Sequence, residues 1–309
     1  MTLLNVDAAV PSQTWALVRL LLSLKKNVPL DDAEAFLCPP SLVPANKSSS
    51  AFRSALSTLR NLGLVHVDQA RNQLSLAGRA TSLDSCDDLA AYTTVLRHAV
   101  FDADLNTDLG VDDSFVGPRD LTRALAWFLM HDPAEPAIDG AEAVRLIDAE
   151  DGKDRSSLKP EVLPLFPNST RWNRLNHWAP FLGLATPSVI RRDGSGSMVP
   201  DCTTAVRQTV FELWHVGHRV NAVEALRALR SALPVLPGGA HSLAIGIASP
   251  GEDVAGPALS FALLRGDDEG WLRLEHDDDA PRPLLIDDAD RPASRRTVSN
   301  ITILEAAHG

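Results

Sequence analysis

Charge along this chain alternates in sign over four blocks of domain size, and this alternation limits how the chain can divide into folding units. Residues 1–82 hold 8 Lys and Arg against 5 Asp and Glu, whereas residues 83–152 hold 4 against 16. Residues 153–233 return to 11 against 6, and residues 234–309 fall to 6 against 13. A chain of 309 residues has room for about two to three domains. We therefore expect basic and acidic units to alternate along it.

The overall composition narrows the class of protein. A net charge of −11 argues against indiscriminate coating of nucleic acid, because the field of the whole molecule would repel phosphate. The longest apolar stretch, residues 15–24, includes Arg19 and Ser23 and is too short to span a bilayer. Three scattered cysteines without a CxxC motif are typical of reduced thiols. The composition predicts a globular cytoplasmic protein with no membrane segment.

The first basic block has the pattern of three helices followed by a β-hairpin. The expected elements are helices over residues 12–26 and 31–37, a third helix that begins at N-caps within 48–50, and strands over 64–67 and 73–76. Gly63 follows the third apolar stripe and predicts a left-handed C-cap. Three helices and a hairpin predict a winged helix-turn-helix over residues 1–82.

The second basic block repeats this pattern at an offset of 120 residues. The residues Phe52, Ala55, Leu59 and Leu62-Gly63-Leu64 correspond to Trp172, Leu175, Ala179 and Leu182-Gly183-Leu184. A hairpin over 188–199 is expected to turn at Asp193-Gly194, since Asp-Gly is a strong turn signal. Similarity at a fixed offset indicates a tandem of related units. We expect a second winged-helix-like unit at residues 153–202.

The remaining segments complete a mainly α fold with small β-hairpins and tandem winged helix-turn-helix domains. Residues 83–152 predict an acidic helical linker domain with helices over 89–100 and 121–130. Residues 203–309 predict an α+β domain, which fits a degenerate third winged helix. Its expected elements are helices over 203–214, 220–233 and 257–264 and strands over 271–274, 283–286 and 298–304. Because this third unit is acidic, we expect it to face protein rather than phosphate.

The two basic blocks supply the candidate contacts with double-stranded DNA. Hydroxyls and free amides at a helix N-terminus bind phosphate, while Arg and Asn give paired hydrogen bonds to guanine and adenine. The candidates are Lys47, Ser48, Ser49, Arg53 and Arg60 in the first block and Arg171, Asn173, Arg174, Arg191 and Arg192 in the second. Solvated helix faces and docking of protein on winged helices remain alternatives.

No catalytic motif competes strongly with this interpretation. His215 and His218 lack further ligands at zinc spacing, and the run at 276–279 lacks the Gly and Glu of a calcium loop. The sharpest enzymatic alternative is a magnesium-dependent nuclease built from Asp139, Asp151 and Lys153. Such enzymes place these residues on adjacent strands, whereas this segment predicts a helix that runs into a loop. We predict no catalytic residue, metal or cofactor.

The acidic loop in the second block predicts a surface for protein partners. Its carboxylates are Asp102, Asp104, Asp108, Asp112 and Asp113. Their density causes repulsion within the free protein, which a positively charged partner would relieve. A solubilising surface is the alternative interpretation.

Two segments have distinctive sequences: Leu3-Leu4-Asn5-Val6 with Pro11-Ser12, and residues 120–133, DLTRALAWFLMHDP. Both resemble the DpdG family of winged-helix-bearing bacterial proteins. The resemblance implies gene clusters that place 7-deazapurines in DNA and restrict unmodified DNA, with helicase- and nuclease-type partners from the same defence cluster. It implies no catalytic residues. We therefore expect a non-enzymatic DNA-contacting or adaptor subunit of an anti-phage complex, with a protein-assembly scaffold as the alternative.

Overall fold

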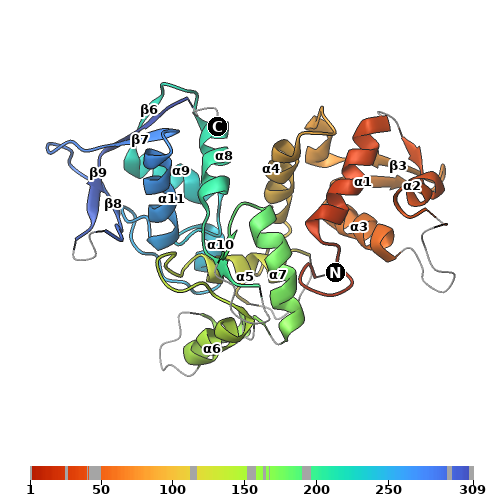
Figure 1. The fold of residues 1–309 in the computed structure, drawn as a ribbon, viewed down its shortest axis with the longest axis horizontal. Coiled ribbons are helices and arrows are strands. Elements are labelled where there is room, and N and C mark those ends of the chain that lie inside the picture. Colours follow the sequence, from red (N-terminus) through yellow and green to blue (C-terminus); the bar gives the residue numbers. More distant parts are fainter. Residues whose placement is uncertain are drawn as a thin grey trace. The chain divides into compact units, whose positions relative to one another are not determined.

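The computed structural model describes residues 2–24, 27–39, 41, 50–111, 117–151, 158–162, 165–166, 168–189, 196–290 and 294–305. Within these ranges the protein is mainly helical with small antiparallel sheets, as the sequence predicts (Figure 1). The chain divides into two compact units. One comprises Met1–Thr107 and Ser114–Leu121, and the other comprises Asp108–Asp113 and Thr122–Gly309.

The described residues at the start of the first unit form three helices and a three-stranded sheet. Its elements are α1 (Pro11–Leu24), β1 (Val28–Pro29), α2 (Leu30–Leu37), α3 (Ser50–Asn61), β2 (Val65–Asp68) and β3 (Gln73–Leu76). The sheet order is β1-β3-β2, with Val65 opposite Leu76 and Val28 opposite Leu74. The three helices and the hairpin are confirmed. The two-residue β1 was not predicted, because it acquires strand geometry only by pairing with β3.

Apolar side chains on α1 and α3 form the core of this unit. Leu17 and Leu21 on α1 and Phe52 and Leu59 on α3 are buried, and Leu74 of β3 is fully buried as well. These residues are four positions apart on α1 and seven apart on α3, so that they share one face of each helix. In Figure 1, α1 and α3 lie together beside β3.

The rest of the first unit packs against α1 and fixes the start of the chain. After a 3-10 turn (Gly78–Ser82), α4 (Leu89–Val100) places Tyr92 against Trp15, with ring centroids 4.9 Å apart. The Tyr92 hydroxyl donates to Thr14 Oγ1 over 2.8 Å. The carboxylate of Asp120 accepts from the amides of Leu3 and Leu4 at 3.0 and 2.8 Å.

Helix α5 (Arg119–Phe128) contains the boundary between the two units and confirms the helix predicted over residues 121–130. Its apolar residues Leu121, Leu125 and Phe128, and Leu129 just after it, are all fully buried. Trp127 is also fully buried. Its ring makes an edge contact with Phe166 at 5.5 Å. Trp127 is therefore a core residue.

The second unit continues with a pair of helices and a short hairpin. Its elements are α6 (Gly140–Asp151), a 3-10 turn (Pro160–Val162), α7 (Ser169–Phe181), β4 (Thr186–Pro187) and β5 (Met198–Val199). β4 and β5 pair in an antiparallel ladder, and Ile138 forms an antiparallel bridge to Met198. The hairpin thus begins slightly earlier than predicted. Its expected Asp-Gly turn lies outside the described residues.

Within its described residues, the C-terminal part of the second unit has four helices and two small sheets. Its elements are α8 (Thr203–Leu213), β6 (Arg219–Asn221), α9 (Ala222–Ala232), α10 (Ala240–Ala244), α11 (Pro257–Asp268), β7 (Leu272–Glu275), β8 (Leu284–Ile286), β9 (Arg296–Val298) and β10 (Asn300–Ile303). One antiparallel sheet has the order β6-β10-β7, and the other pairs β8 with β9. Figure 1 shows α8, α9 and α11 beside the strands.

Two expected boundaries in this region are wrong. The helix expected over 220–233 begins at residue 222, because Arg219–Asn221 pairs with β10. The side chain of Asn221 then caps α9 by accepting from the amides of Val223 and Glu224. The strand expected over 298–304 is two strands, because the chain leaves the β8 sheet at Val298 and enters the other sheet at Asn300.

The helices α3, α7 and α11 end in the same way. Gly63, Gly183 and Gly270 follow these helices with φ of 68°, 73° and 75°, a conformation that favours glycine. The next residue donates its amide to the carbonyl five positions earlier, over 2.9, 2.9 and 3.2 Å respectively. Those next residues, Leu64, Leu184 and Trp271, are buried and lead toward β2, β4 and β7. One cap therefore directs three helices into three strands.

Candidate nucleic-acid interface

The outer face of α3 presents two arginines. Arg53, Ser57, Arg60 and Asn61 are spaced four, three and one residues apart, which places them on one side of the helix. The opposite side carries the core residues Phe52, Ala55 and Leu59. Ser57, Arg60 and Asn61 line a hollow of about 220 Å³. This face combines positive charge with hydrogen-bonding groups, which are the side chains that bind phosphate and base edges.

An acidic residue on the neighbouring helix moderates this charge. Arg53, whose side chain is 68% exposed, lies 3.8 Å from the carboxylate of Glu34 on α2. An exposed pair of this kind contributes little to stability and separates readily in favour of a stronger anion. Arg53 therefore stays available to a phosphate group.

Arg71 is another exposed cation in this unit, and it is not among the candidate DNA contacts predicted from the sequence. Arg71 lies in the turn between β2 and β3, with its side chain 75% exposed. The carboxylate of Asp68 accepts from the amides of Ala70 and Arg71 and shapes this turn. The position of Arg71 between the two predicted strands of the winged helix could have identified it as a candidate DNA contact. Lys47, Ser48 and Ser49 lie outside the described residues.

The corresponding helix of the second basic block presents less charge. Asn173 on α7 is exposed and Arg174 is half-buried, but Arg171 retains only 7% of its surface exposed. This burial argues against a direct contact between Arg171 and DNA, because a bound phosphate needs the guanidinium at the surface. Arg191 and Arg192 lie outside the described residues.

Helix α7 also holds one end of its hairpin. Asn168 caps the helix by accepting from the Arg171 amide at 3.3 Å. Trp172 Nε1 and Asn176 Nδ2 both donate to the carbonyl of Gly196, over 3.1 and 3.2 Å. The hairpin end is therefore fixed against the helix. No sequence pattern indicates this role for Trp172 or Asn176.

Two residues of the nuclease alternative, Asp139 and Asp151, lie at opposite ends of α6. Asp139 precedes α6 and caps it, since its Oδ1 accepts from the amides of Ala141 and Glu142 at 2.9 Å each. Asp151 is the last residue of this 12-residue helix. A helix of that length rises roughly 18 Å at about 1.5 Å per residue, so the backbone holds these two positions far apart. Lys153 lies outside the described residues.

The other polar clusters also lack the geometry of a metal centre. The rings of His215 and His218 meet edge to face with centroids 5.1 Å apart. His276 Nε2 lies 2.9 Å from Asp278, and its Nδ1 lies 3.0 Å from the Thr297 hydroxyl. Across the described ranges, no three His, Cys, Asp or Glu side chains are grouped so that they could hold a metal ion.

The acidic loop is only partly described. Asp102 is half-buried, and its side chain accepts from the Asp104 amide at 3.0 Å. Asp104 and Asp108 are exposed, and Asp108 has a positive φ of 60°. Asp112 and Asp113 lie outside the described residues. The contact between these carboxylates and a protein partner stays a prediction.

Comparison with known proteins identifies the family. The family model described as DpdG-like matches residues 1–280, which is most of the chain. No curated protein and no solved structure matches it. None of the described helices has the length and apolar character needed to cross a membrane. The chain therefore belongs to the DpdG-like family, as the resemblance predicts, and this membership associates it with the Dpd-type 7-deazapurine modification cluster.

Proposed function

We propose that the chain contains three winged-helix modules in tandem. The support is a shared order of elements: helix, strand, helix, helix, strand, strand, with the first strand paired antiparallel to the last. The order runs through α1, β1, α2, α3, β2 and β3 in the first module. It recurs as α5, Ile138, α6, α7, β4 and β5, and again as α8, β6, α9, α11, β7 and β10.

The shared glycine cap after the third helix of each module supports the same assignment, because it sets the angle at which the second strand leaves. The second module then begins at α5 rather than at residue 153. Two helices of the expected acidic linker, α5 and α6, become its first two helices. The third module differs by two insertions, α10 between its second and third helices and the β8-β9 hairpin between its last two strands.

On this framework, we propose that the protein is a non-enzymatic subunit of a defence complex and contacts double-stranded DNA through α3. The observation that carries the proposal is the exposure of Arg53 and Arg60 on the third helix of the first module, with Arg71 in its hairpin. In helix-turn-helix proteins this helix enters the major groove. Asn173 and Arg174 on α7, with Arg191 and Arg192, are a secondary contact.

A protein-assembly scaffold is the second candidate. The burial of Arg171 and the pairing of Arg53 with Glu34 favour it, because both reduce the positive charge offered to DNA. In this alternative, the winged helices and the acidic residues Asp102, Asp104, Asp108, Asp112 and Asp113 contact other proteins of the same cluster.

Binding of a labelled DNA duplex to the full chain, followed by fluorescence anisotropy over a range of salt concentrations, distinguishes the two candidates. Arg53→Glu with Arg60→Glu should weaken binding and reduce the slope of log affinity against log salt by about 0.9 per lost phosphate contact. The matched control reverses two exposed arginines away from α3, Arg79→Glu with Arg282→Glu. If the two double variants bind DNA with the same affinity and the same salt slope, α3 does not contact DNA and the protein-assembly scaffold is the better candidate.

Two further assays complete the test. Cross-linking mass spectrometry of the assembled complex should place a partner on the acidic loop, and changing its five aspartates to Asn should weaken assembly. Asp151→Ala and Lys153→Ala should leave any magnesium-dependent cleavage by the complex unchanged. Loss of cleavage in either folded variant would restore the nuclease interpretation.

A further inference from the structure

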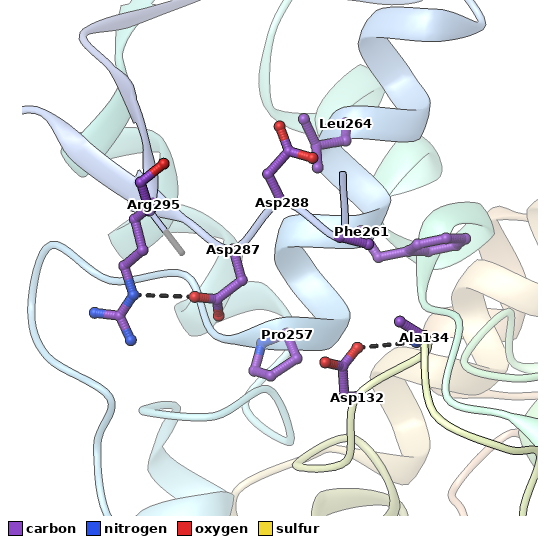
Figure 2. A pocket seen from close by; sticks show the side chains of 10 residues that line it. Asp132, Ala134, Pro257, Phe261, Leu264, Asp287, Asp288 and Arg295 are labelled. Carbon is purple, nitrogen blue, oxygen red and sulfur yellow. Dashed lines mark hydrogen bonds and ion pairs between the residues drawn. The ribbon is translucent and has the colours of Figure 1, made fainter. Parts of the chain in front are cut away.

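An open pocket of about 440 Å³ lies on the exposed face of α11 in the second unit (Figure 2). Pro257, Phe261 and Leu264 form its apolar wall at spacings of four and three residues, so that they share one side of the helix. Phe261 keeps 37% of its surface exposed, although its neighbours Ala258 and Ala262 are fully buried. An exposed aromatic ring within a hollow is a typical anchor point for a partner.

Carboxylates surround this apolar wall. Asp132 comes from the loop after α5, and Asp287 and Asp288 follow β8. Arg295 is the cation among the described lining residues, and its Nε lies 3.0 Å from Asp287 Oδ1. The described lining therefore holds three carboxylates and one guanidinium. The resulting negative charge repels phosphate and attracts a cation.

Hydrogen bonds to the backbone hold these acidic residues in place. Asp132 Oδ1 accepts from the Ala134 amide at 2.9 Å, as Figure 2 shows, and Asp288 Oδ1 accepts from the Asp290 amide at 3.0 Å. The amide of Asp287 donates to Ser260 Oγ on α11 over 2.9 Å, which ties the end of β8 to the helix. A pocket whose charged groups are already ordered loses less entropy when a ligand binds.

The pocket wall belongs to α11, the third helix of the proposed third module. Asp287 and Asp288 belong to the insertion between the last two strands of that module, and Asp132 comes from the loop after α5. The third helix of the first module exposes Arg53 and Arg60, whereas α11 exposes Phe261 in this pocket. The two helices therefore present different chemistry, which suits different kinds of partner.

We propose that this pocket docks an arginine-bearing segment of a protein partner. The partner's guanidinium would lie over the Phe261 ring and pair with Asp287 or Asp288, since arginine stacks on aromatic faces and pairs with carboxylates. The aliphatic part of the same arginine, or a neighbouring apolar residue, would lie on Pro257 and Leu264. The inference rests on the pocket lining and stands whether or not α3 contacts DNA.

A short fluorescent peptide of alternating Arg and Leu tests the proposal against the full chain by anisotropy. A second peptide with citrulline in place of Arg keeps the shape and removes the charge. We expect Phe261→Ala, and separately Asp287→Asn with Asp288→Asn, to weaken binding of the arginine peptide by about tenfold or more. The citrulline peptide should bind the unchanged protein more weakly by a similar factor.

Matched controls separate this pocket from general attraction to an acidic protein. Asp278→Asn with Asp279→Asn removes two exposed carboxylates elsewhere in the same unit, and Phe36→Ala removes an exposed ring from the other unit. Both control variants should bind the arginine peptide with the affinity of the unchanged protein. Phe261→Leu retains an apolar side chain and serves if the alanine variant fails to fold by circular dichroism.

The proposal would be overturned if the arginine peptide did not bind at millimolar concentration, or if the citrulline peptide bound as tightly as the arginine peptide. It would also be overturned if the control variants lost as much affinity as the pocket variants. Light scattering provides a further test. If the free chain is a dimer that Phe261→Glu converts to a monomer, the occupant is a second copy of this chain and not an arginine-bearing partner.

Discussion

Ile138 and Met198 form an antiparallel bridge in which each amide donates to the other residue's carbonyl over 2.9 Å. Between them in the sequence lie α6 and α7. This pair closes the second repeat of the helix and strand order, in the way that β1 closes the first by pairing with β3. Both side chains are buried, so that neither amide can exchange its partner for water without local opening.

Ile138→Pro should destabilise the second unit, because proline removes the donor and leaves the buried Met198 carbonyl without its amide partner. The expected cost is about 2–3 kcal/mol. Ile138→Val is the control and should cost about 1 kcal/mol through lost packing alone. Urea unfolding measures both, and hydrogen exchange at the Met198 amide should accelerate in the proline variant. Unchanged protection of that amide would contradict the pairing.

Asp120→Asn should release the N-terminal segment. The buried carboxylate accepts from the amides of Leu3 and Leu4 with its two oxygens, and an Asn amide offers only one acceptor. We expect a loss of about 1.5–3 kcal/mol, as for hydrogen bonds to a charged group, and faster exchange of both leucine amides. Asp84→Asn removes an exposed carboxylate in the same unit and should change neither quantity.

Arg230→Lys should destabilise the C-terminal part of the second unit. The guanidinium of Arg230 donates to the carbonyls of Pro237, Gly251 and Val254 at 2.9, 2.9 and 2.7 Å. A lysine ammonium on a thinner stem does not reproduce this planar fork, so we expect a loss of about 3 kcal/mol in urea unfolding. Arg227→Lys, three residues earlier on an exposed position, should be nearly neutral. Similar losses in both variants would show that the three carbonyls do not need Arg230.

Glu275 should contribute to stability in a pH-dependent way. Hydrogen bonds from the Thr302 hydroxyl and from Arg219, each at 2.7 Å, lower its pKa in the folded protein. The unfolded chain therefore binds more protons, and the contribution is complete above the unfolded pKa of about 4.3 and is lost as pH falls through the lower folded pKa. Because the group is partly exposed, the effect should not exceed about 1 kcal/mol.

Unfolding measured from neutral to acidic pH tests the role of Glu275. Glu275→Gln should flatten the acid side of the stability profile, and Thr302→Val should move the pKa of Glu275 back toward its ordinary value in an NMR titration. Profiles that coincide with that of the unchanged protein in both variants would be evidence against this linkage.

The sequence alone determined the elements whose hydrogen bonds close within a few residues. The stripe Phe52, Ala55 and Leu59 predicts α3, and Leu-Gly-Leu predicts its cap, because both depend on spacing and on the left-handed freedom of glycine. The offset of 120 residues located the same cap at Gly183 for the same reason. The hairpin of β2 and β3 was equally readable, since its two strands alternate around one polar turn.

Only the tertiary structure decided what depends on distant residues. β1, β6 and the Ile138 bridge are too short to show a pattern, and each acquires β-pairing only through a partner far along the chain. The exposure of each arginine is decided in the same way. Arg171 and Arg53 look equally available in the sequence, yet packing buries the first and leaves the second in water, because burial depends on which elements meet in three dimensions.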